Sequence, residues 1–297
     1  MDWLIIAFVA TVFWAVGVVI DKYILTKHMQ DAFSYQLLYM ITETPVMLLL
    51  LFTPISYALP WSLLGVIGGL GIYPALILYF KAMAIEEASR VISLWYLSPI
   101  FVLLLAYVFL EEKLSLLSYL GVVFLVLGAI FISYRIDKGK KSLISPALGL
   151  ILASGVLFAG YEILTKFVLD AMDYFSYFFW NLVGTAMVGF SLFCFSKIRG
   201  KFLTDIKRVN RTVLFWRILN TSLGLVGTVF YYIAISSGPV SLVSAAGSLE
   251  PFFVFAITLM LSLFLPKVLK EETGKRVLII KALAIVLIVG GTWLITK

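Results

Sequence analysis

Cysteine and histidine are almost absent from this sequence. Cys194 is the single cysteine, so an intrachain disulfide is excluded, and its apolar surroundings predict a small buried side chain. His28 is the single histidine and lies in a short polar stretch. One residue of each kind offers no basis for a metal site or for a Cys-His or Ser-His catalytic centre. We therefore expect no metal, no cofactor and no enzymatic activity.

Charged residues are scarce as well. They make up 13% of the chain, whereas hydrophobic residues make up 62%, and soluble domains carry about 25% charged residues. A soluble protein of 297 residues cannot hide so much apolar surface. We therefore predict an all-α integral membrane protein of the inner or plasma membrane. The net charge of +7 fits basic loops at membrane boundaries better than it fits a nucleic-acid partner.

Two further signals are missing. The first apolar segment, 3–20, has no basic stretch before it and no small-residue cleavage site, so we expect a membrane helix there and not a cleaved signal peptide. The chain also lacks a Walker A motif, so direct coupling to ATP within it is not expected.

Long apolar runs dominate what is present. A spanning helix needs about 20 mostly apolar residues, and the short connections between such runs leave no room for a soluble domain. Ten spanning helices are predicted, at residues 3–20, 34–53, 62–80, 91–110, 115–134, 146–165, 174–195, 212–235, 241–265 and 277–296.

The two halves of the chain repeat each other. DAFSY at Asp31 returns as DYFSY at Asp173, and FWAVGVVIDKYIL at 13–25 resembles LFAGYEILTKFVL at 157–169. A third block beginning at 79 matches one beginning at 231, at a constant offset of 152. Three ordered blocks indicate a duplicated unit. The predicted parts are a first repeat at 1–137, a linker at 138–145 and a second repeat at 146–297.

Each predicted repeat holds five helices, an odd number, so the second repeat must enter the membrane in the opposite direction. The basic loops agree, because they follow the first and third helices of the first half but the second and fourth of the second half. Together with the linker, these loops place 18 of the 23 Lys and Arg on one side. The positive-inside rule makes that side cytoplasmic and places both termini outside.

This sequence resembles the EamA-type branch of the drug/metabolite transporter superfamily over nearly its whole length. The resemblance lies in the two five-helix halves, in VFLEEKLSLLSYLGVVFLVLGAIFIS at 108–133 and in LEPFF at 249–253. It implies an inverted-repeat bundle around a central cavity that moves small metabolites such as amino acids, their analogues or toxic amphiphiles. Such transporters usually carry basic residues after the second helix, where TPISYALP at 53–60 has none, and their termini are generally cytoplasmic.

Two carboxylates are predicted near the middle of the membrane. Glu43 and Glu250 each lie about ten residues into their helices, where a charge costs about 2.5–3.5 kcal/mol on insertion scales. Each is a candidate for binding a cationic group or for taking up a proton; a hydrogen-bonded structural carboxylate is the alternative. Pro251 follows Glu250, and Pro99 holds the matching place in the first half, so both helices are predicted to bend and to gate the cavity.

Other charged residues favour structural roles. Glu162 and Lys166 are four residues apart and are a possible ion pair along one helix. Four basic side chains are expected to extend from helix interiors to the headgroups, namely Lys22, Lys81, Arg217 and Lys281.

Aromatic residues are plentiful on the predicted helices. Trp14, Trp95 and Tyr79 are our candidates for cavity-lining rings, because rings around a carboxylate suit an organic cation through cation–π contact. Asn181 is a candidate polar contact. Glycines cluster at 65–71 and 224–227, where close helix packing is the expected role.

These observations predict a secondary-active transporter, an exporter of small metabolites such as amino acids or amphiphilic amines, that alternates access between its two repeats. Uptake or exchange of a single metabolite, or flipping of a lipid-linked group, is an alternative within transport. A non-transporting membrane subunit or scaffold is an alternative of another class. The expected partners are a small-molecule substrate and membrane lipid, with the chain acting as a monomer or homodimer.

Overall fold

The computed structural model describes residues 2–85, 91, 94–95, 97–132, 147–264, 275–295 and 297. Within these ranges every regular element is a helix. The predicted linker at 138–145 lies outside the described residues, as does the side chain of Lys281.

Each of the ten predicted ranges contains a helix. In the first half these are α1 (Asp2–Lys27), α2 (Ala32–Leu50), α3 (Trp61–Ile85), α5 (Ser98–Phe109) and α6 (Leu116–Ile132). The second half holds α7 (Leu148–Leu169), α8 (Tyr174–Cys194), α9 (Ser196–Asp205), the 3-10 helix η1 (Ile206–Arg208), α10 (Arg211–Ser237), α11 (Val240–Gly247), α12 (Glu250–Phe264) and α13 (Lys275–Ile295).

Five of these helices are long and apolar enough to cross a membrane, over Asp2–Leu25, Trp61–Ile85, Leu148–Leu169, Tyr174–Cys194 and Arg211–Ser237. The chain is therefore a multi-pass membrane protein. The count of ten spans stays a prediction.

Two local predictions were wrong. The polar segment after 196 was expected to be a loop, but it forms α9 and η1 because Phe202 and Ile198 pack inward against the α1–α2 side of the molecule. A ten-residue amphipathic helix is too short and too polar for a hydropathy window to detect. Cys194, expected to be buried, is exposed at the end of α8.

Pro99 and Pro251 each lie in the first turn of a helix. Pro99 is in the first turn of α5, and Pro251 is the second residue of α12, which follows the short helix α11. A proline lacks the backbone N–H and is tolerated in the first turn of a helix, where that donor has no helical partner. The predicted helix at 241–265 is therefore two helices. The role of the prolines in gating stays a prediction.

The repeated phrase at 31–35 and 173–177 builds the same helix start twice. The carboxylate of Asp31 accepts the Ser34 N–H at 2.8 Å, and that of Asp173 accepts the Ser176 N–H at 2.9 Å, the usual N-cap bond. Partial burial raises the pKa of Asp173, but hydrogen bonds from Ser176 and Phe175 outweigh it and hold that pKa below its ordinary value.

The tyrosine that ends each phrase is fully buried and bonds back to the preceding helix. The Tyr35 hydroxyl donates to Asp21, and the Tyr177 hydroxyl shares a hydrogen bond of 2.6 Å with Thr165. Asp21 and Thr165 occupy equivalent places in the aligned blocks at 13–25 and 157–169. The same local solution thus appears in both halves.

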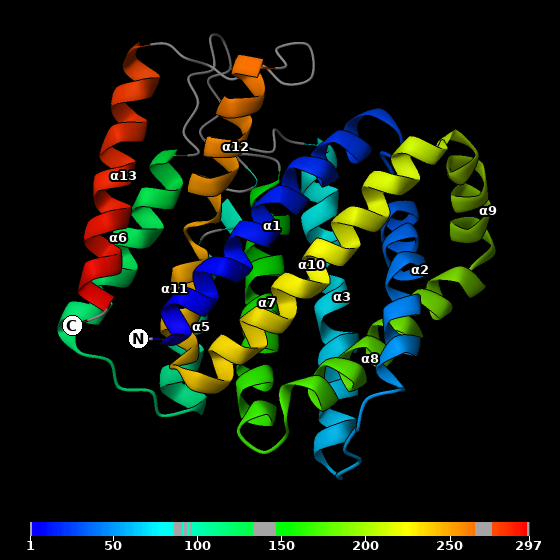
Figure 1. Cartoon of the computed structure of the whole chain (residues 1–297), viewed down its shortest axis with the longest axis horizontal. Helices are drawn as coiled ribbons and strands as arrows, with labels where there is room; N and C mark the ends of the chain where they lie inside the picture. The colour runs from blue at the N-terminus through cyan, green and yellow to red at the C-terminus, as the bar shows by residue number, and fades with distance from the viewer. Residues whose placement is uncertain are drawn as a thin grey trace.

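The two halves interlock. α1 packs along α10, α3 packs on α7 and α8, and α6 pairs with α13 (Figure 1). By their order in each half, α1 corresponds to α7, α3 to α10 and α6 to α13. The α1–α10 contact in one direction thus corresponds to the α7–α3 contact in the other, and the α6–α13 contact corresponds to itself. Two related halves packed about a pseudo-two-fold axis give such a pattern; the repeats and their opposite directions in the membrane stay predictions.

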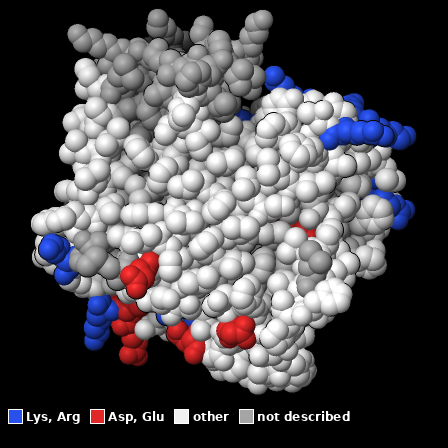
Figure 2. Space-filling model, viewed as in Figure 1, with Lys and Arg blue, Asp and Glu red and all other residues white. Residues whose placement is uncertain are grey.

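Charges are unevenly distributed over the surface. Lys and Arg side chains gather toward the upper right of Figure 2, a smaller basic group lies at the lower left, and Asp and Glu side chains lie along the lower edge. Both chain termini lie toward the lower left of the same view (Figure 1). The orientation of the termini relative to the cytoplasm stays a prediction.

Two glycines allow α3 and α8 to touch. A Cβ on Gly69 would overlap the carbonyl oxygen of Asn181, and a Cβ on Gly184 would overlap that of Val66. Backbone atoms cannot rotate out of the way as a flexible side chain can, so these positions require glycine. By contrast, a Cβ on Gly71 would meet nothing within 4 Å.

We predict that Gly69→Ala lowers the stability of the folded protein by at least about 1–3 kcal/mol, the usual cost of overpacking. Gly71→Ala on the same helix is the matched control, and it should be neutral or slightly stabilising because alanine favours the helix. Thermal unfolding of both purified variants in detergent measures the difference. Equal unfolding temperatures would contradict the close α3–α8 contact.

The positive-inside rule predicts that α9 lies on the cytoplasmic side. In a Cys194→Ser background, a cysteine at the exposed position Thr204 should resist a membrane-impermeant thiol reagent added to intact cells. A cysteine at Ala171, in the exposed turn between α7 and α8, should react. The reverse pattern would show that both termini are cytoplasmic.

Candidate functional site

A cavity of about 260 Å³ lies among helices of both halves. It is slightly smaller than the 300–1,000 Å³ of typical ligand pockets, so its size suits a small metabolite. All six residues that the sequence singled out as substrate-binding or proton-coupling candidates line it, namely Glu250, Glu43, Trp14, Trp95, Tyr79 and Asn181. The structure brings them together; their roles in binding stay predictions.

Aromatic rings form two groups in the cavity wall. In one, Trp95 lies between Tyr79 and Phe158, with ring centroids 4.9 and 5.0 Å apart. In the other, the Trp14 ring lies 4.8 Å from that of Tyr231, and the Trp14 indole N–H donates to the Gly224 carbonyl at 3.4 Å. Ring faces close to a carboxylate attract an organic cation.

Polar groups line the same cavity. Three of the described lining residues are carboxylates, Asp21, Glu43 and Glu250, and none is a lysine or arginine. Gln36 and Tyr73 also line it; both are buried, their side chains lie close to each other, and neither makes a hydrogen bond of good geometry to a third described residue. Buried polar groups normally find a partner, so this part of the wall is suited to a polar ligand.

Sequence reasoning missed the strongest charge pair beside the cavity. Asp21 of α1 and Arg217 of α10 form an ion pair of 2.9 Å, and Asn220 also donates to the same Asp21 oxygen. This pair joins the first half of the chain to the second. The sequence carried no signal for it, because the two residues are 196 positions apart and their helices meet only in the folded bundle.

Arg217 was expected to extend to the headgroups, and this was wrong. Its side chain is fully buried, donates to the Tyr35 hydroxyl at 2.6 Å and to Thr221 at 2.9 and 3.2 Å, and stacks over the Tyr39 ring at 4.2 Å. The inward position is favourable because the hydroxyl oxygens accept hydrogen bonds from the guanidinium and the Tyr39 ring stabilises its positive charge. Extension to the surface would leave Asp21 without its counterion.

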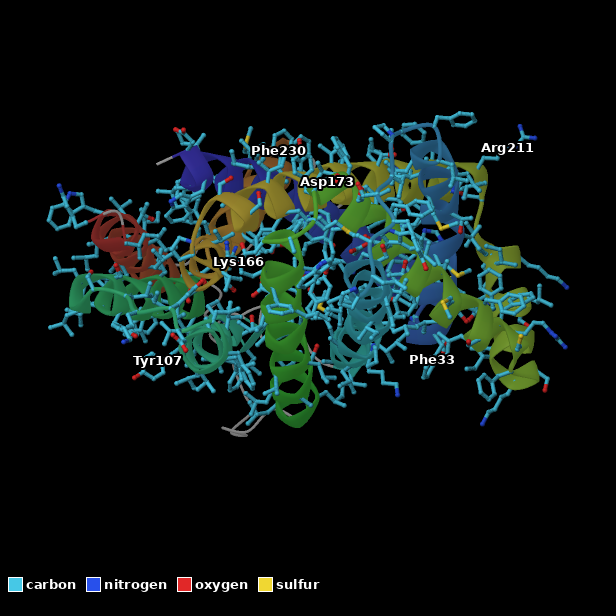
Figure 3. All side chains as sticks on the ribbon, turned by 90° about the horizontal axis from the view of Figure 1, so that it is seen from below. Phe33, Tyr107, Lys166, Asp173, Arg211 and Phe230 are labelled. Atoms are coloured by element: carbon cyan, nitrogen blue, oxygen red, sulfur yellow. The ribbon has the colours of Figure 1, made fainter. Side chains whose placement is uncertain are left out.

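The predicted pair between Glu162 and Lys166 is replaced by other partners. Glu162 accepts hydrogen bonds from Tyr231 and Ser244, whereas the Lys166 ammonium pairs with Asp170 at 2.9 Å and donates to a carbonyl of α10 at 3.1 Å. Lys166 lies in the last turn of α7, so its long side chain reaches the end of α10. Figure 3 shows it where these two helices approach each other.

Comparison with known proteins gives a partial match in sequence. Residues 1–134 match the model of the EamA-like transporter family. An "Uncharacterized transporter in cobO 3'region" from Sinorhizobium sp is 36% identical over 73 residues, which are 25% of this chain and 51% of that protein. The chain thus spans about half the length of this curated relative. Both findings confirm the predicted resemblance to EamA-type transporters, which are not enzymes.

Solved structures share this fold, and one crystal structure among them matches nearly the whole chain. It has a TM-score of 0.66 and 17% identical residues, and the match covers 99% of this chain and 96% of the other. At this identity the likeness concerns the fold alone.

We predict that Arg217→Gln lowers stability by about 3–5 kcal/mol, because it leaves the Asp21 carboxylate without a counterion in the membrane interior. The double variant Asp21→Asn/Arg217→Gln should regain a large part of that loss, since no uncompensated charge remains. A double-mutant cycle from unfolding in detergent measures the coupling. Additive effects of the two single changes would show that the pair contributes nothing to stability.

Proposed function

On the premise that residues 1–134 match the EamA-like transporter family, we propose that this protein is a secondary-active exporter of small cationic metabolites. The substrate occupies the central cavity, and the two halves expose that cavity to one side of the membrane at a time. Amphiphilic amines, and amino acids through their ammonium groups, are the expected substrates.

The convergence of carboxylates and rings on one cavity carries this proposal. Glu43 comes from the first half and Glu250 from the second, and both line the cavity together with Trp95, Tyr79 and Trp14. Carboxylates attract an ammonium group, and the ring faces stabilise it further by about 0.5–2 kcal/mol each. A cavity formed between two halves is also the place where inverted-repeat transporters bind their substrates.

Movement of the cavity wall is expected at the break between α11 and α12. Glu250 is the first residue of α12, directly after the break that separates α12 from α11. A change in the angle between these two helices moves Glu250 relative to the rest of the cavity wall. Pro99 lies at the equivalent place in the first half, in the first turn of α5.

The alternatives fit less well. Substrates with phosphate groups, including lipid-linked ones, need basic side chains at the cavity, and the described lining residues include no lysine or arginine. A scaffold needs a dry, tightly packed interface between its halves, whereas a cavity of about 260 Å³ lies there. Uptake or exchange of one metabolite uses the same site, so the direction of transport rests on the family resemblance.

We predict that Glu250→Gln lowers transport at least tenfold while the protein remains folded, because the amide cannot attract an ammonium group. The measurement is flux of labelled tryptamine, putrescine and leucine in liposomes containing the purified protein. Asp2→Asn, an exposed carboxylate far from the cavity in sequence and position, is the matched control and should transport normally. Unchanged flux in Glu250→Gln would remove Glu250 from the site, and no flux of any probe in the wild type would favour the scaffold.

A further inference from the structure

The short helix α11 is held in place by two carboxylates from different parts of the chain. All residues from Val240 to Ala246 are buried. At its first turn, Glu112 accepts the backbone N–H groups of Val240 at 2.8 Å and Ser241 at 3.2 Å, together with the Ser241 hydroxyl. One turn later, the Ser244 hydroxyl donates to Glu162 at 2.7 Å.

Glu162 differs from the other carboxylates of the bundle. Its side chain is fully buried and is not part of the cavity wall. Tyr231 donates to Oε1 and Ser244 donates to Oε2. No ion pair joins it to a lysine or arginine in the parts of the chain that the structure describes.

The groups around Glu162 are almost all neutral. Tyr231 of α10 is the titratable side chain in contact with it, and Tyr161 is its neighbour on α7. Lys166 on the same helix is bonded to Asp170 and to α10 instead. From α3, α5, α8 and α11, Ser244 is the one described side chain that bonds to it. Glu112 acts one turn away, at Ser241.

A charge in such a place is unfavourable. A buried carboxylate without a counterion costs several kcal/mol in real proteins, and it commonly takes up a proton instead. Two hydroxyl donors reduce this cost without removing it. Glu162 is therefore suited to exist in two states, a charged state held by Tyr231 and Ser244 and a neutral state that carries a proton.

We propose that Glu162 is the proton-binding site of this transporter and that its protonation changes how α11 is held. The coupling of this proton to transport rests on the proposed function. Proton binding at Glu162 can be tested without any substrate.

The proton reaches Glu162 through Tyr231. Tyr231 is one of the residues that line the cavity, and its hydroxyl bonds to Glu162. A hydroxyl can accept one proton from the cavity while it passes its own to the carboxylate, because it is both donor and acceptor. The overall step adds one proton to the carboxylate and leaves Tyr231 neutral.

The proton then alters the attachment of α11. In the charged state, both oxygens of Glu162 accept, one from Tyr231 and one from Ser244. In the neutral state, one oxygen carries the proton and becomes a donor, so the hydroxyl facing it must turn round and accept or must leave. The relay through Tyr231 places the proton on Oε1, so Tyr231 is the hydroxyl that turns round and accepts. Ser244 then donates to an oxygen of a neutral acid, a weaker acceptor than a carboxylate, so the bond that holds α11 to α7 is weakened. Because α12 and Glu250 follow α11 directly, the change is passed to the substrate cavity.

Infrared difference spectroscopy of the purified full chain, between alkaline and acidic pH, tests the proton site directly. We expect a carboxylic acid C=O band that gains intensity on acidification and of which one component is missing in Glu162→Gln. Asp2→Asn should leave that component unchanged. Tyr231→Phe and Ser244→Ala keep the carboxyl group but remove one hydrogen bond each, so they should shift its frequency; they also serve if Glu162→Gln does not fold. A spectrum that none of the three variants alters would overturn the proposal.

Transport by the same variants tests the coupling. We expect Glu162→Gln to retain exchange of labelled for unlabelled tryptamine across the liposome membrane. The accumulation of tryptamine that an imposed pH gradient drives should be at least tenfold lower than in the wild type. Glu162→Asp should restore part of that accumulation. Full accumulation in Glu162→Gln would overturn the coupling. A wild type that transports no probe but shows the Glu162 band would remove the proposed function and leave the proton site.

Discussion

Polar groups within the hydrocarbon region need partners inside the protein or in a water-filled cavity, because lipid offers none. The bundle satisfies this constraint with side chains that cross between helices far apart in sequence. Arg217 is the clearest case, since its guanidinium bonds to Asp21, Tyr35 and Thr221 and lies over the Tyr39 ring. These bonds tie α10 to α1 and α2, so one buried charge positions a large part of the cavity wall.

The two halves of the chain meet this constraint with related but unequal networks. Tyr35 reaches Asp21 in the first half, and Tyr177 reaches Thr165 at the equivalent place in the second. Threonine carries no charge, so the second network needs no arginine. An ionisable carboxyl group appears instead at Glu162, which two hydroxyls hold. The local geometry is therefore alike in both halves, while the position of the buried ionisable group differs.

Much of the fold was predictable from the sequence, because hydropathy and the repeated blocks depend on local composition. Bends at Pro99 and Pro251 were predicted for the same reason, whereas the division of the helix at 241–265 into α11 and α12 was not predicted. The six cavity candidates were found because a polar or aromatic side chain within an apolar run can be recognised without knowledge of its partners. Partners were not predictable in this way. Glu162 has Lys166 at the right spacing on its own helix, yet its partners come from α10 and α11, and only the packing of helices decides which face of α7 meets them.

The short helix α11 connects these observations. A helix of eight residues has little stability of its own in isolation, so its position depends on the groups that hold it. Here those groups are Glu112 from the first half and Glu162 from the second, and the helix leads directly to Glu250 in the cavity. A segment with weak intrinsic order, two ionisable attachments and a direct link to the substrate site is well suited to convert a small electrostatic change into a movement. Rigid packing elsewhere, as between Gly69 of α3 and the α8 backbone, confines that movement to the part of the bundle where it affects the cavity.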